Sequence, residues 1–294
     1  KLKTCVHWGI RFLDDVIDVN RYPLNPIDDI TRRNRKIGLG VMGFADMLIL
    51  LGIPYNSPQA VAMAKKIMRF INNQSISASV DLAEERDVFP NFKQSVYAPG
   101  DMRLRNATVN TIAPTGTISI ITGSSSGIEP LFAVSFVRNV LSGKQLFEVN
   151  PIFEQMAKEA GIYSDRLLEE IARAGSVQSV AGVPNGLKRL FVTAFDVSPE
   201  QHLQIQAAFQ RYTDNAVSKT INLPRDASVD QVRQIYRRAH ELKCKGITVY
   251  RDGSKKEQVL RFGDAPKDAA PYRNDYLTAD SEYTGGCISA GCPF

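Results

Sequence analysis

Helix-start signals alternate with short β-rich runs along this chain, and this alternation limits the fold more than any other feature of the sequence. Ser57, Asn150, Ser198 and Ser228 are N-cap residue types, and each precedes an apolar pattern of helical spacing. Runs rich in apolar and β-branched residues lie between and after these helices, at residues 107–113, 135–141, 189–195, 216–223 and 246–250. Helices of about ten residues or more between strands of about five predict an α/β fold with largely parallel strand pairing.

The first residues of the chain predict a helix rather than the start of a protein. Apolar residues recur at helical spacing from Val6 to Ile17, and the segment has neither an initial Met nor the pattern of a signal peptide. We therefore expect the chain to be a fragment, or a separately made half, of something larger. Asp14, Asp15 and Asp18 form an acidic face on this helix, which we expect to pair with arginines or to face solvent rather than to bind a metal.

The charge of the chain is mildly basic, +5 in 294 residues, and the charges are scattered. The densest cluster, Thr31 to Lys36, is expected to be solvated surface, so the sequence favours an enzyme for phosphorylated small molecules and no nucleic-acid partner. No apolar run approaches the ~20 residues of a membrane span, which predicts that no membrane is involved. Four cysteines do not make a secreted disulfide framework in a chain of this length, so a cytoplasmic location is expected.

Composition divides the chain near position 260. Residues 1–260 carry the helix and strand patterns, whereas residues 261–294 are rich in Gly, Pro, Ala and Asp without periodicity and predict a mobile tail. The tail holds a Cys-x4-Cys pair, Cys287 and Cys292. Cys244, between the last helix and the last strand of the first part, is expected to be a buried small hydrophobic residue.

Gly38, Gly40 and Gly43 spell G-x-G-x-x-G, the pattern of a dinucleotide-binding turn. Such a turn needs a buried strand before the glycines and an acidic residue at the end of a second strand about 20 residues later. Here the glycines follow the polar stretch "DITRRNRK", and a helical pattern stands where the second strand would end. We interpret the glycines as allowing a tight turn and close packing of the following helix, expected from Phe44 to Leu51.

A second glycine-bearing loop has chemistry that suits a phosphate. The first β-rich run ends at Pro114 and is followed by Thr115, Gly116, Thr117 and Ser119. Backbone amides left open around a glycine, together with hydroxyl donors, are the groups that hold phosphate oxygens. No Lys follows, so the loop is not a Walker A motif. From these residues alone, a phosphate site and an ordinary Ser/Gly loop both stay open.

Longer stretches carry a family resemblance. In chain order they are "RKIGLGVMGFADML", "NATVNTIAPTGTISIITGSSSGIEPLFA", "TDNAVSKTINLP" and "KCKGITVYRDGSKKEQVL". They resemble the C-terminal half of the catalytic chain of class II ribonucleotide reductases, the adenosylcobalamin-dependent enzymes of that family. The resemblance extends from about Leu2 to Leu260, and agreement of ordered blocks over this length is far more specific than any single motif.

The resemblance implies a fold and a role for the second loop. The chain would form the second half of a ten-stranded α/β barrel with a flexible C-terminal tail, and the loop would hold the phosphates of a ribonucleotide substrate, usually a diphosphate in relatives with this turn. The residues of the turn are Pro114, Thr115, Gly116, Thr117, Ile118 and Ser119. Gly116 agrees with class II, because the class I turn usually has Ala. Tyr250 stands alone where class I chains carry a Tyr pair.

The resemblance also implies a redox role for the tail. Cys287 and Cys292 are similar to the C-terminal thiols that reduce the active-site disulfide after each turnover and are recharged by a thioredoxin-like reductant. The glycines that flank them would give the tail the freedom to reach. The alternatives are two casual cysteines or half of a zinc site, and the redox pair is favoured because zinc needs four ligands and His7, His202 and His240 are far from the tail in sequence.

One departure from the family limits what this chain can do. The family's radical chemistry needs an Asn-x-Cys-x-Glu loop, which does not occur in this sequence, and the family places that loop upstream of what is Lys1 here. Cys5 has no Glu two residues later and is no substitute. We therefore expect a catalytically incomplete chain that needs the upstream half of the reductase. An open half-barrel would expose apolar strand edges, so a partner chain or self-association, such as a homodimer, is expected.

The leading functional interpretation is part of a ribonucleotide reductase. The complete enzyme would convert ribonucleotides to 2′-deoxyribonucleotides for DNA synthesis, by cysteine-radical chemistry that adenosylcobalamin starts. The alternative is a non-catalytic nucleotide- or partner-binding half-subunit, and a nicotinamide-dependent oxidoreductase would rest on Gly38 to Gly43 alone. His202 is expected to be a structural histidine rather than a group that lines an active site.

Overall fold

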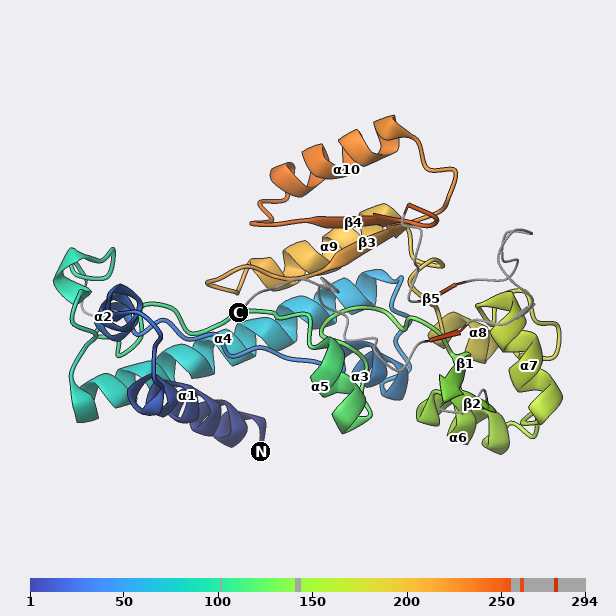
Figure 1. Cartoon of the computed structure of the whole chain (residues 1–294), viewed down its shortest axis with the longest axis horizontal. Helices are drawn as coiled ribbons and strands as arrows, with labels where there is room; N and C mark the ends of the chain where they lie inside the picture. Colours follow the sequence, from blue (N-terminus) through green and yellow to red (C-terminus); the bar gives the residue numbers. More distant parts are fainter. Residues whose placement is uncertain (101, 141–143, 255–259, 262–277, 280–294) are drawn as a thin grey trace.

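The computed structural model describes residues 1–294 except 101, 141–143, 255–259, 262–277 and 280–294. Its helices are α1 (Leu2–Val19), α2 (Asn25–Asn34), α3 (Phe44–Leu50), α4 (Pro58–Arg86), the 3-10 turn η1 (Phe92–Gln94), α5 (Gly116–Thr122), α6 (Pro151–Glu159), α7 (Asp165–Ala174), α8 (Asn185–Leu190), α9 (Pro199–Gln210) and α10 (Val229–Glu241). Its strands are β1 (Ser135–Val140), β2 (Lys144–Val149), β3 (Thr220–Leu223), β4 (Thr248–Arg251), β5 (Leu260–Arg261) and β6 (Thr278–Ala279). Helices and strands mix along the chain (Figure 1), as predicted.

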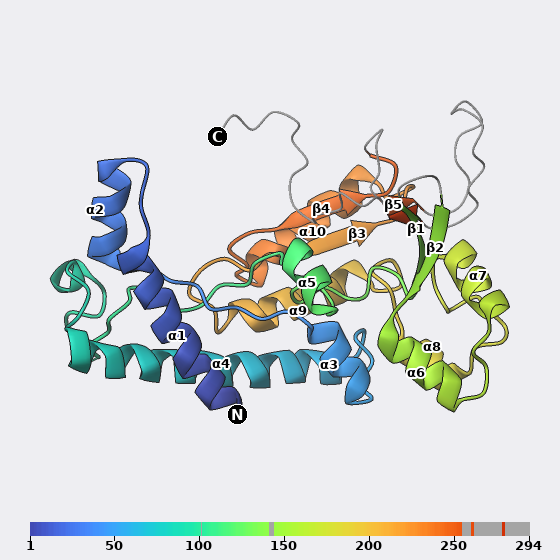
Figure 2. The ribbon, with the colours of Figure 1, turned by 60° about the horizontal axis from the view of Figure 1, so that its bottom comes forward.

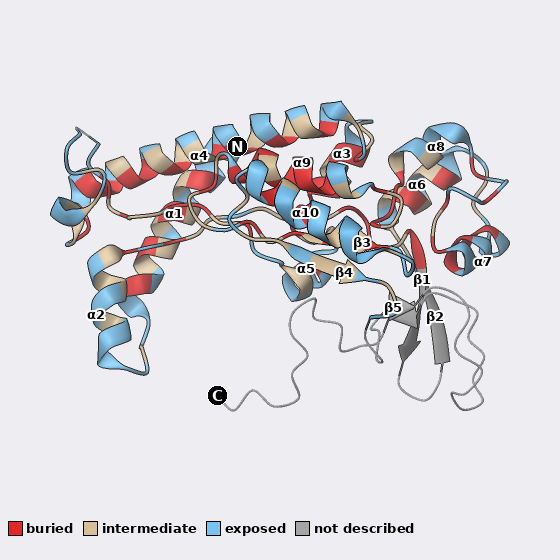
Figure 3. Ribbon diagram, turned by 90° about the horizontal axis from the view of Figure 1, so that it is seen from above, coloured by how far each residue is buried: buried red, intermediate tan, exposed pale blue. Residues whose placement is uncertain are grey.

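The long helix α4 runs along the N-terminal part of the molecule, and α1 packs against it (Figures 1 and 2). α1 buries Val6, Ile10 and Ile17 in the main core, which is the face that the sequence predicts. α4 begins where expected, because the hydroxyl of Ser57 accepts a hydrogen bond from Ala60 N at 3.2 Å. α2 buries none of its residues and projects beyond the end of α1 (Figure 3). No helix among the described residues is long and apolar enough to cross a bilayer.

Strands β3 and β4 pair in parallel, with Ile221 opposite Val249, and carry a second, smaller core. Leu203 of α9 and Ile235 of α10 meet β3 there, so α9 lies between this sheet and α4 (Figure 1). Cys244 packs against the same core and is half-buried, in agreement with its expected hydrophobic role, and burial raises the pKa of its thiol.

The predicted N-cap residues Ser198 and Ser228 differ in how the residue three positions later completes the cap. At α10 a capping box closes: Gln231 N donates to the hydroxyl of Ser228 and Ser228 N donates to the side chain of Gln231. At α9 the hydroxyl of Ser198 accepts from Gln201 N, but the side chain of Gln201 donates to the carbonyls of Tyr55 and Ser57 instead. Gln201 therefore joins the start of α9 to the start of α4.

Extended segments cross the molecule between these helices and pair in parallel. Single β-bridges join Leu39 to Asn110, Ile112 to Val217 and Leu131 to Thr193. The predicted runs 107–113 and 189–195 contribute such bridges rather than regular strands, and the second run begins inside α8. Parallel pairing is thus confirmed for these bridges and for β3 with β4.

One strand pairing departs from the expectation. The predicted run 135–141 forms β1, but β1 pairs antiparallel with β2, a strand that the sequence analysis missed. Only residues 141–143 separate the two strands, and a connection this short can join only antiparallel neighbours. The sheet continues from β1 to β6 in parallel and from β6 to β5 in antiparallel order.

The acidic face of α1 is paired with arginines, as expected. Asp14 is fully buried, and its carboxylate accepts from Arg35 at 2.8 Å, Arg105 at 3.2 Å and Arg86 at 3.4 Å. Arg35 also donates to both carboxylate oxygens of Asp18. Within the described part of the chain, no group of His, Cys, Asp and Glu could hold a metal ion.

The cluster from Thr31 to Lys36 was expected to be solvated surface, and this is wrong for one of its residues. Arg32 and Arg33 do form solvated pairs one helical turn apart, with Asp28 and Asp29. Arg35 instead turns inward at a left-handed backbone position and is 4% exposed, because the buried carboxylate of Asp14 needs a partner.

Candidate phosphate-binding site

The predicted turn lies at the start of a short helix. Residues 107–113 lead to Pro114, and α5 begins at Gly116, with Thr115 as its N-cap residue. The sequence analysis treated the stretch after the turn as a loop, whereas Gly116–Thr122 is helical and presents Ile118 to solvent. The six predicted turn residues are contiguous, so the fold places them together at one helix end.

Thr115 has a strained backbone conformation. Its φ of 59° and ψ of 22° lie in the left-handed region, which a β-branched residue rarely adopts. Two contacts hold it there: its hydroxyl accepts a hydrogen bond from Gly127 N at 2.7 Å, and the hydroxyl of Ser126 donates to the carbonyl of Pro114 at 2.5 Å. Strain of this kind, held in place by surrounding contacts, is typical of ligand-binding turns.

The conformation of Thr115 leaves the first turn of α5 without a side-chain cap. The N–H groups at the start of a helix have no partner within the helix, and Gly116, Thr117 and Ile118 occupy those positions. Thr117 is exposed and offers its hydroxyl, whereas the hydroxyl of Ser119 is turned back onto the carbonyl of Gly116 at 3.0 Å. The N–H groups of Gly116, Thr117 and Ile118 and the hydroxyl of Thr117 thus stay open, whereas the hydroxyls of Thr115 and Ser119 are engaged by Gly127 N and by the carbonyl of Gly116.

The segment from Ser125 to Glu129 supports the turn through hydrogen bonds, and it is itself hydrogen-bonded to the start of α3. Gly43 N donates to the carbonyl of Ser125 at 2.7 Å, and Ser125 N donates to the carboxylate of Asp46 at 2.5 Å. Gly43 is the N-cap residue of α3, at φ 76°, where a side chain would be strained. The last glycine of the G-x-G-x-x-G pattern therefore serves the phosphate turn indirectly.

The other two glycines of the pattern permit a close approach between chain segments. A Cβ on Gly38 would lie 2.5 Å from the Cγ2 of Thr111, and a Cβ on Gly40 would lie 2.3 Å from the carbonyl oxygen of Thr111. The sequence analysis expected close packing of the helix after the glycines. The structure shows that the tight contact is made by the residues before that helix, which run beside Asn110 in parallel.

Glu129, the last residue of the supporting segment, forms an ion pair with the buried Lys219. Lys219 Nζ donates to Glu129 Oε2 at 2.5 Å and to the carbonyl of Thr220 at 3.1 Å. Burial lowers the pKa of Lys219 and Glu129 raises it, with burial the larger effect. The buried ring of Tyr55 lies 6.0 Å from Nζ, and burial together with the Glu129 charge raises the pKa of its hydroxyl. Sequence reasoning missed this pair, although a Lys inside the β-rich run 216–223 was a visible signal.

His202 is a structural histidine, as expected. It is fully buried, and its Nε2 lies 2.9 Å from the carbonyl of Ala194. Burial, together with the charge of Lys219, lowers the pKa of His202 to about 3. The imidazole is therefore neutral at physiological pH, with Nε2 as the hydrogen-bond donor.

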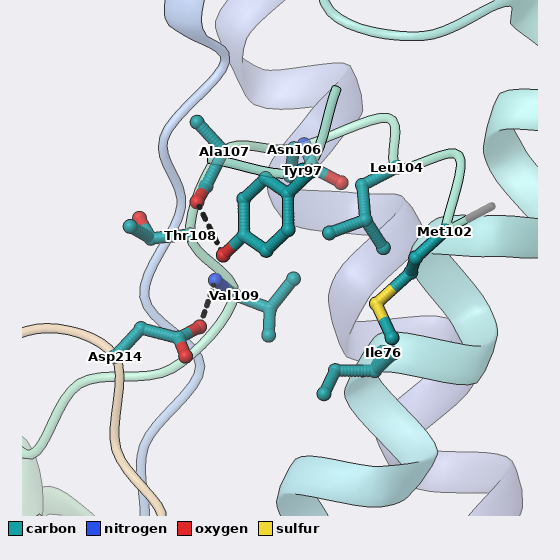
Figure 4. Close-up of a pocket in the computed structure, with 9 residues that line it drawn as sticks. All are labelled: Ile76, Tyr97, Met102, Leu104, Asn106, Ala107, Thr108, Val109 and Asp214. Carbon is teal, nitrogen blue, oxygen red and sulfur yellow. Dashed lines mark hydrogen bonds between the residues drawn. The ribbon is translucent and has the colours of Figure 1, made fainter. Parts of the chain in front are cut away.

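Two hollows formed by described residues are small. One of about 30 Å³ is lined by residues that include Tyr97, Leu104 and Asp214, and Tyr97 donates to the carbonyl of Ala107 across it (Figure 4). Another of about 140 Å³ lies beside Arg189. Cofactor pockets usually measure about 300–1,000 Å³. Neither of these two hollows is large enough for a corrin ring.

The structure tests only in part the other residues that the sequence analysis weighed. Cys287 and Cys292 are outside the described residues. Cys5 is exposed on α1, and Tyr250 lies in β4, half-buried.

Comparison with known proteins agrees with the fold. The model of the family "Ribonucleotide reductase, barrel domain" matches residues 1–104 and 100–250. The vitamin B12-dependent ribonucleoside-diphosphate reductase of Thermoplasma acidophilum is 49% identical over 99% of this chain, and that of Mycobacterium tuberculosis is 49% identical over 97%. The class Id ribonucleotide reductase alpha subunit of Actinobacillus ureae has the same fold, with a TM-score of 0.71 at 24% identity over 86% of this chain and 46% of its own.

The fold is thus that of an α/β barrel domain. The chain belongs to the ribonucleotide reductase family, and within it the relatives of highest identity named above are B12-dependent enzymes. The chain spans about 39% of the length of those two relatives.

Proposed function

We propose that this chain is the part of an adenosylcobalamin-dependent ribonucleoside-diphosphate reductase that holds the substrate's phosphates and carries the reducing tail. The observation that supports this most is the turn at Thr115, where a strained N-cap residue leaves the first N–H groups of α5 open. The 49% identity to B12-dependent reductases supplies the substrate class and the cofactor.

The phosphate site consists of the backbone N–H groups of Gly116, Thr117 and Ile118 with the Thr117 hydroxyl. These groups favour an anion because their dipoles point out of the helix start, and an exposed position lets the phosphate oxygens approach. Pro114 and Ser119 shape the turn without donating to the ligand. Adenosylcobalamin, bound elsewhere in the complete enzyme, supplies the radical that starts ribonucleotide reduction.

The radical cysteine lies in another part of the enzyme, because the sequence contains no Asn-x-Cys-x-Glu motif. That upstream part packs on the apolar side of α1 that faces away from α4. Trp8 and Phe12 are 67% and 66% exposed there, and Val19 is 78% exposed. Aromatic side chains this exposed, at helical spacing on a helix already packed on its other side, are typical of a buried interface.

Cys287 and Cys292 act as the exchangeable dithiol of the complete enzyme. They reduce the disulfide left after each turnover, and a thioredoxin-like protein reduces them in turn. The enzyme works in the cytoplasm, where thiols are kept reduced, and two copies of the complete chain form a homodimer.

A second candidate function is a non-catalytic half-subunit that binds nucleotide or a partner chain. The missing radical loop favours it, since the phosphate turn needs no radical to bind a ligand. The two candidates differ in one property: only the first predicts turnover when the rest of the enzyme is supplied.

The test measures deoxyribonucleoside diphosphate formed from a ribonucleoside diphosphate, with adenosylcobalamin and a dithiol. The chain is assayed alone and then with an upstream half that bears the Asn-x-Cys-x-Glu loop. Turnover only in the mixture supports the reductase, and Cys287→Ser should then abolish turnover with a thioredoxin-type reductant. A folded mixture that binds nucleotide without turnover supports the half-subunit. Turnover by the chain alone contradicts the proposed lack of a radical cysteine.

A further inference from the structure

The amino group of Lys219 lies where the fold gives it no access to water. Its side chain is 0% exposed, whereas that of its partner Glu129 is 26% exposed. Removing an ammonium group from water costs more than a single ion pair usually returns, and an apolar residue of similar volume is often as stable there. A buried pair of this kind therefore calls for a role other than stability.

The carboxylate of Glu129 joins two segments that are 90 residues apart in sequence. One oxygen accepts from Lys219 Nζ, and the other accepts from Thr220 N at 2.6 Å. Thr220 is the first residue of β3, and Lys219 directly precedes it. Glu129 thereby fixes the end of the supporting segment to β3, and Tyr55 fixes it to the α4 side by donating to the carbonyl of Ile128 at 2.5 Å.

The fixed segment is the one that holds the strained turn. Gly127, two residues before Glu129, donates its N–H to the hydroxyl of Thr115, and Ser126 donates its hydroxyl to the carbonyl of Pro114. A short series of contacts therefore runs from Lys219 through Glu129 and Gly127 to Thr115. Because Thr115 would leave the left-handed region if unsupported, the position of Gly127 decides whether the α5 amides stay open to a ligand.

We propose that Glu129 and Lys219 are positioning residues of the phosphate turn: their buried pair fixes the supporting segment to β3, and so holds Thr115 in the conformation that exposes the first N–H groups of α5. Neither side chain contacts the phosphate. The identity of the ligand as a phosphate rests on the proposed function, whereas the positioning role of the pair rests only on the contacts described above. If the pair served only stability, its removal would destabilise the fold without changing the conformation of the turn.

The test uses Glu129→Gln, Lys219→Met and the double variant in the full 294-residue chain. Glu129→Gln sets an amide donor against a buried ammonium, so it should disturb the turn most. Lys219→Met removes the charge and leaves a carboxylate that water can reach, so its effect should be smaller. In the double variant the effect should be close to that of Lys219→Met, because the two groups act as one unit.

Two measurements are made on each variant: hydrogen exchange of the backbone amides in residues 115–128, and affinity for ADP as the probe. We expect exchange in this range to rise in Glu129→Gln and ADP affinity to fall about tenfold or more. Ile235→Val, a small change in the β3–α10 core, is the control for general destabilisation. Glu200→Gln, which breaks the exposed pair with Arg238, is the control for loss of a distant ion pair.

Unchanged exchange at residues 115–128 in both single variants, with a melting temperature lowered as in Ile235→Val, would overturn the positioning role. If Glu129→Gln does not fold, Lys219→Met and the double variant decide the same question. Absence of ADP binding by the unaltered chain would count against the proposed function. The exchange measurement would still decide the positioning role in that case, so the two failures are distinguishable.

Discussion

The hydroxyl of Thr115 accepts a hydrogen bond from Gly127 N at 2.7 Å, and this contact holds a threonine at a φ of 59°. The same contact keeps the hydroxyl from capping α5. A side chain of the usual N-cap type is thus used to fix the turn and not to close the helix end, which leaves that end available to a ligand.

Thr115→Val should weaken phosphate binding and destabilise the chain. Valine keeps the shape of threonine but cannot accept from Gly127, so a buried N–H loses its partner at a cost of about 1–3 kcal/mol. Thr115→Ser keeps the hydroxyl and should bind as the unaltered chain does. Titration calorimetry with ADP and chemical denaturation measure the two effects. Equal ADP affinity in the Val and Ser variants would contradict the role of this hydrogen bond.

Gly40→Ala should destabilise the chain by about 1–3 kcal/mol, as overpacking of a tight contact does. The added Cβ would lie 2.3 Å from the carbonyl oxygen of Thr111, so two backbone segments would have to separate. Gly186→Ala is the matched control, because nothing lies within 4 Å of the added Cβ in α8. Denaturant unfolding of both variants measures the difference. Similar stabilities would show that the segments at Gly40 and Thr111 separate at little cost.

Asp14→Asn should cost up to about 3–5 kcal/mol of stability, because the fully buried carboxylate charge that Arg35, Arg86 and Arg105 share is lost and Asp18 remains as the only carboxylate bonded to Arg35 among the described residues. Asp15→Asn removes a carboxylate that is 47% exposed and pairs with Arg86, so it should cost no more than about 1 kcal/mol. Thermal and denaturant unfolding compare the two variants. A cost for Asp15→Asn as large as that for Asp14→Asn would mean that burial does not decide the strength of these pairs.

The buried His202 should lower the free energy of unfolding of the chain as the pH falls. The folded chain holds this imidazole neutral, with its pKa lowered to about 3, whereas the unfolded chain binds a proton below about pH 6.5. Protons therefore favour the unfolded state, and the contribution of His202 to stability should fall by roughly 1 kcal/mol per pH unit as the pH drops from about 6 towards 3. His202→Gln should reduce this slope, and His240→Gln, at an exposed position on α10, should not. Denaturant unfolding at a series of pH values measures the slopes.

Local signals in the sequence predicted local structure well, and contacts distant in sequence were harder to foresee. Ser57 and Ser228 predicted their helices because a cap depends on residues three positions away. The stretch "TISIIT" was not expected to be helical, since β-branched residues disfavour helices and the contact that fixes the turn before α5 comes from Gly127, outside the stretch. Glu129 and Lys219 meet across 90 residues, and no local pattern pairs them.

The exposed face of α1 gives the last prediction, which tests the interface with the upstream part of the reductase. Trp8→Ser and Phe12→Ser should each weaken association with that part, because each replaces a large apolar side chain expected to be buried there and worth roughly 1.5–3 kcal/mol when fully buried. The fold of the chain itself should persist, since both side chains are about two-thirds exposed in it. Tyr236→Ser, at an aromatic residue 51% exposed on α10, is the matched control and should leave association unchanged. Sedimentation of mixed halves measures the affinity, and equal weakening by all three variants would argue against a specific interface on α1.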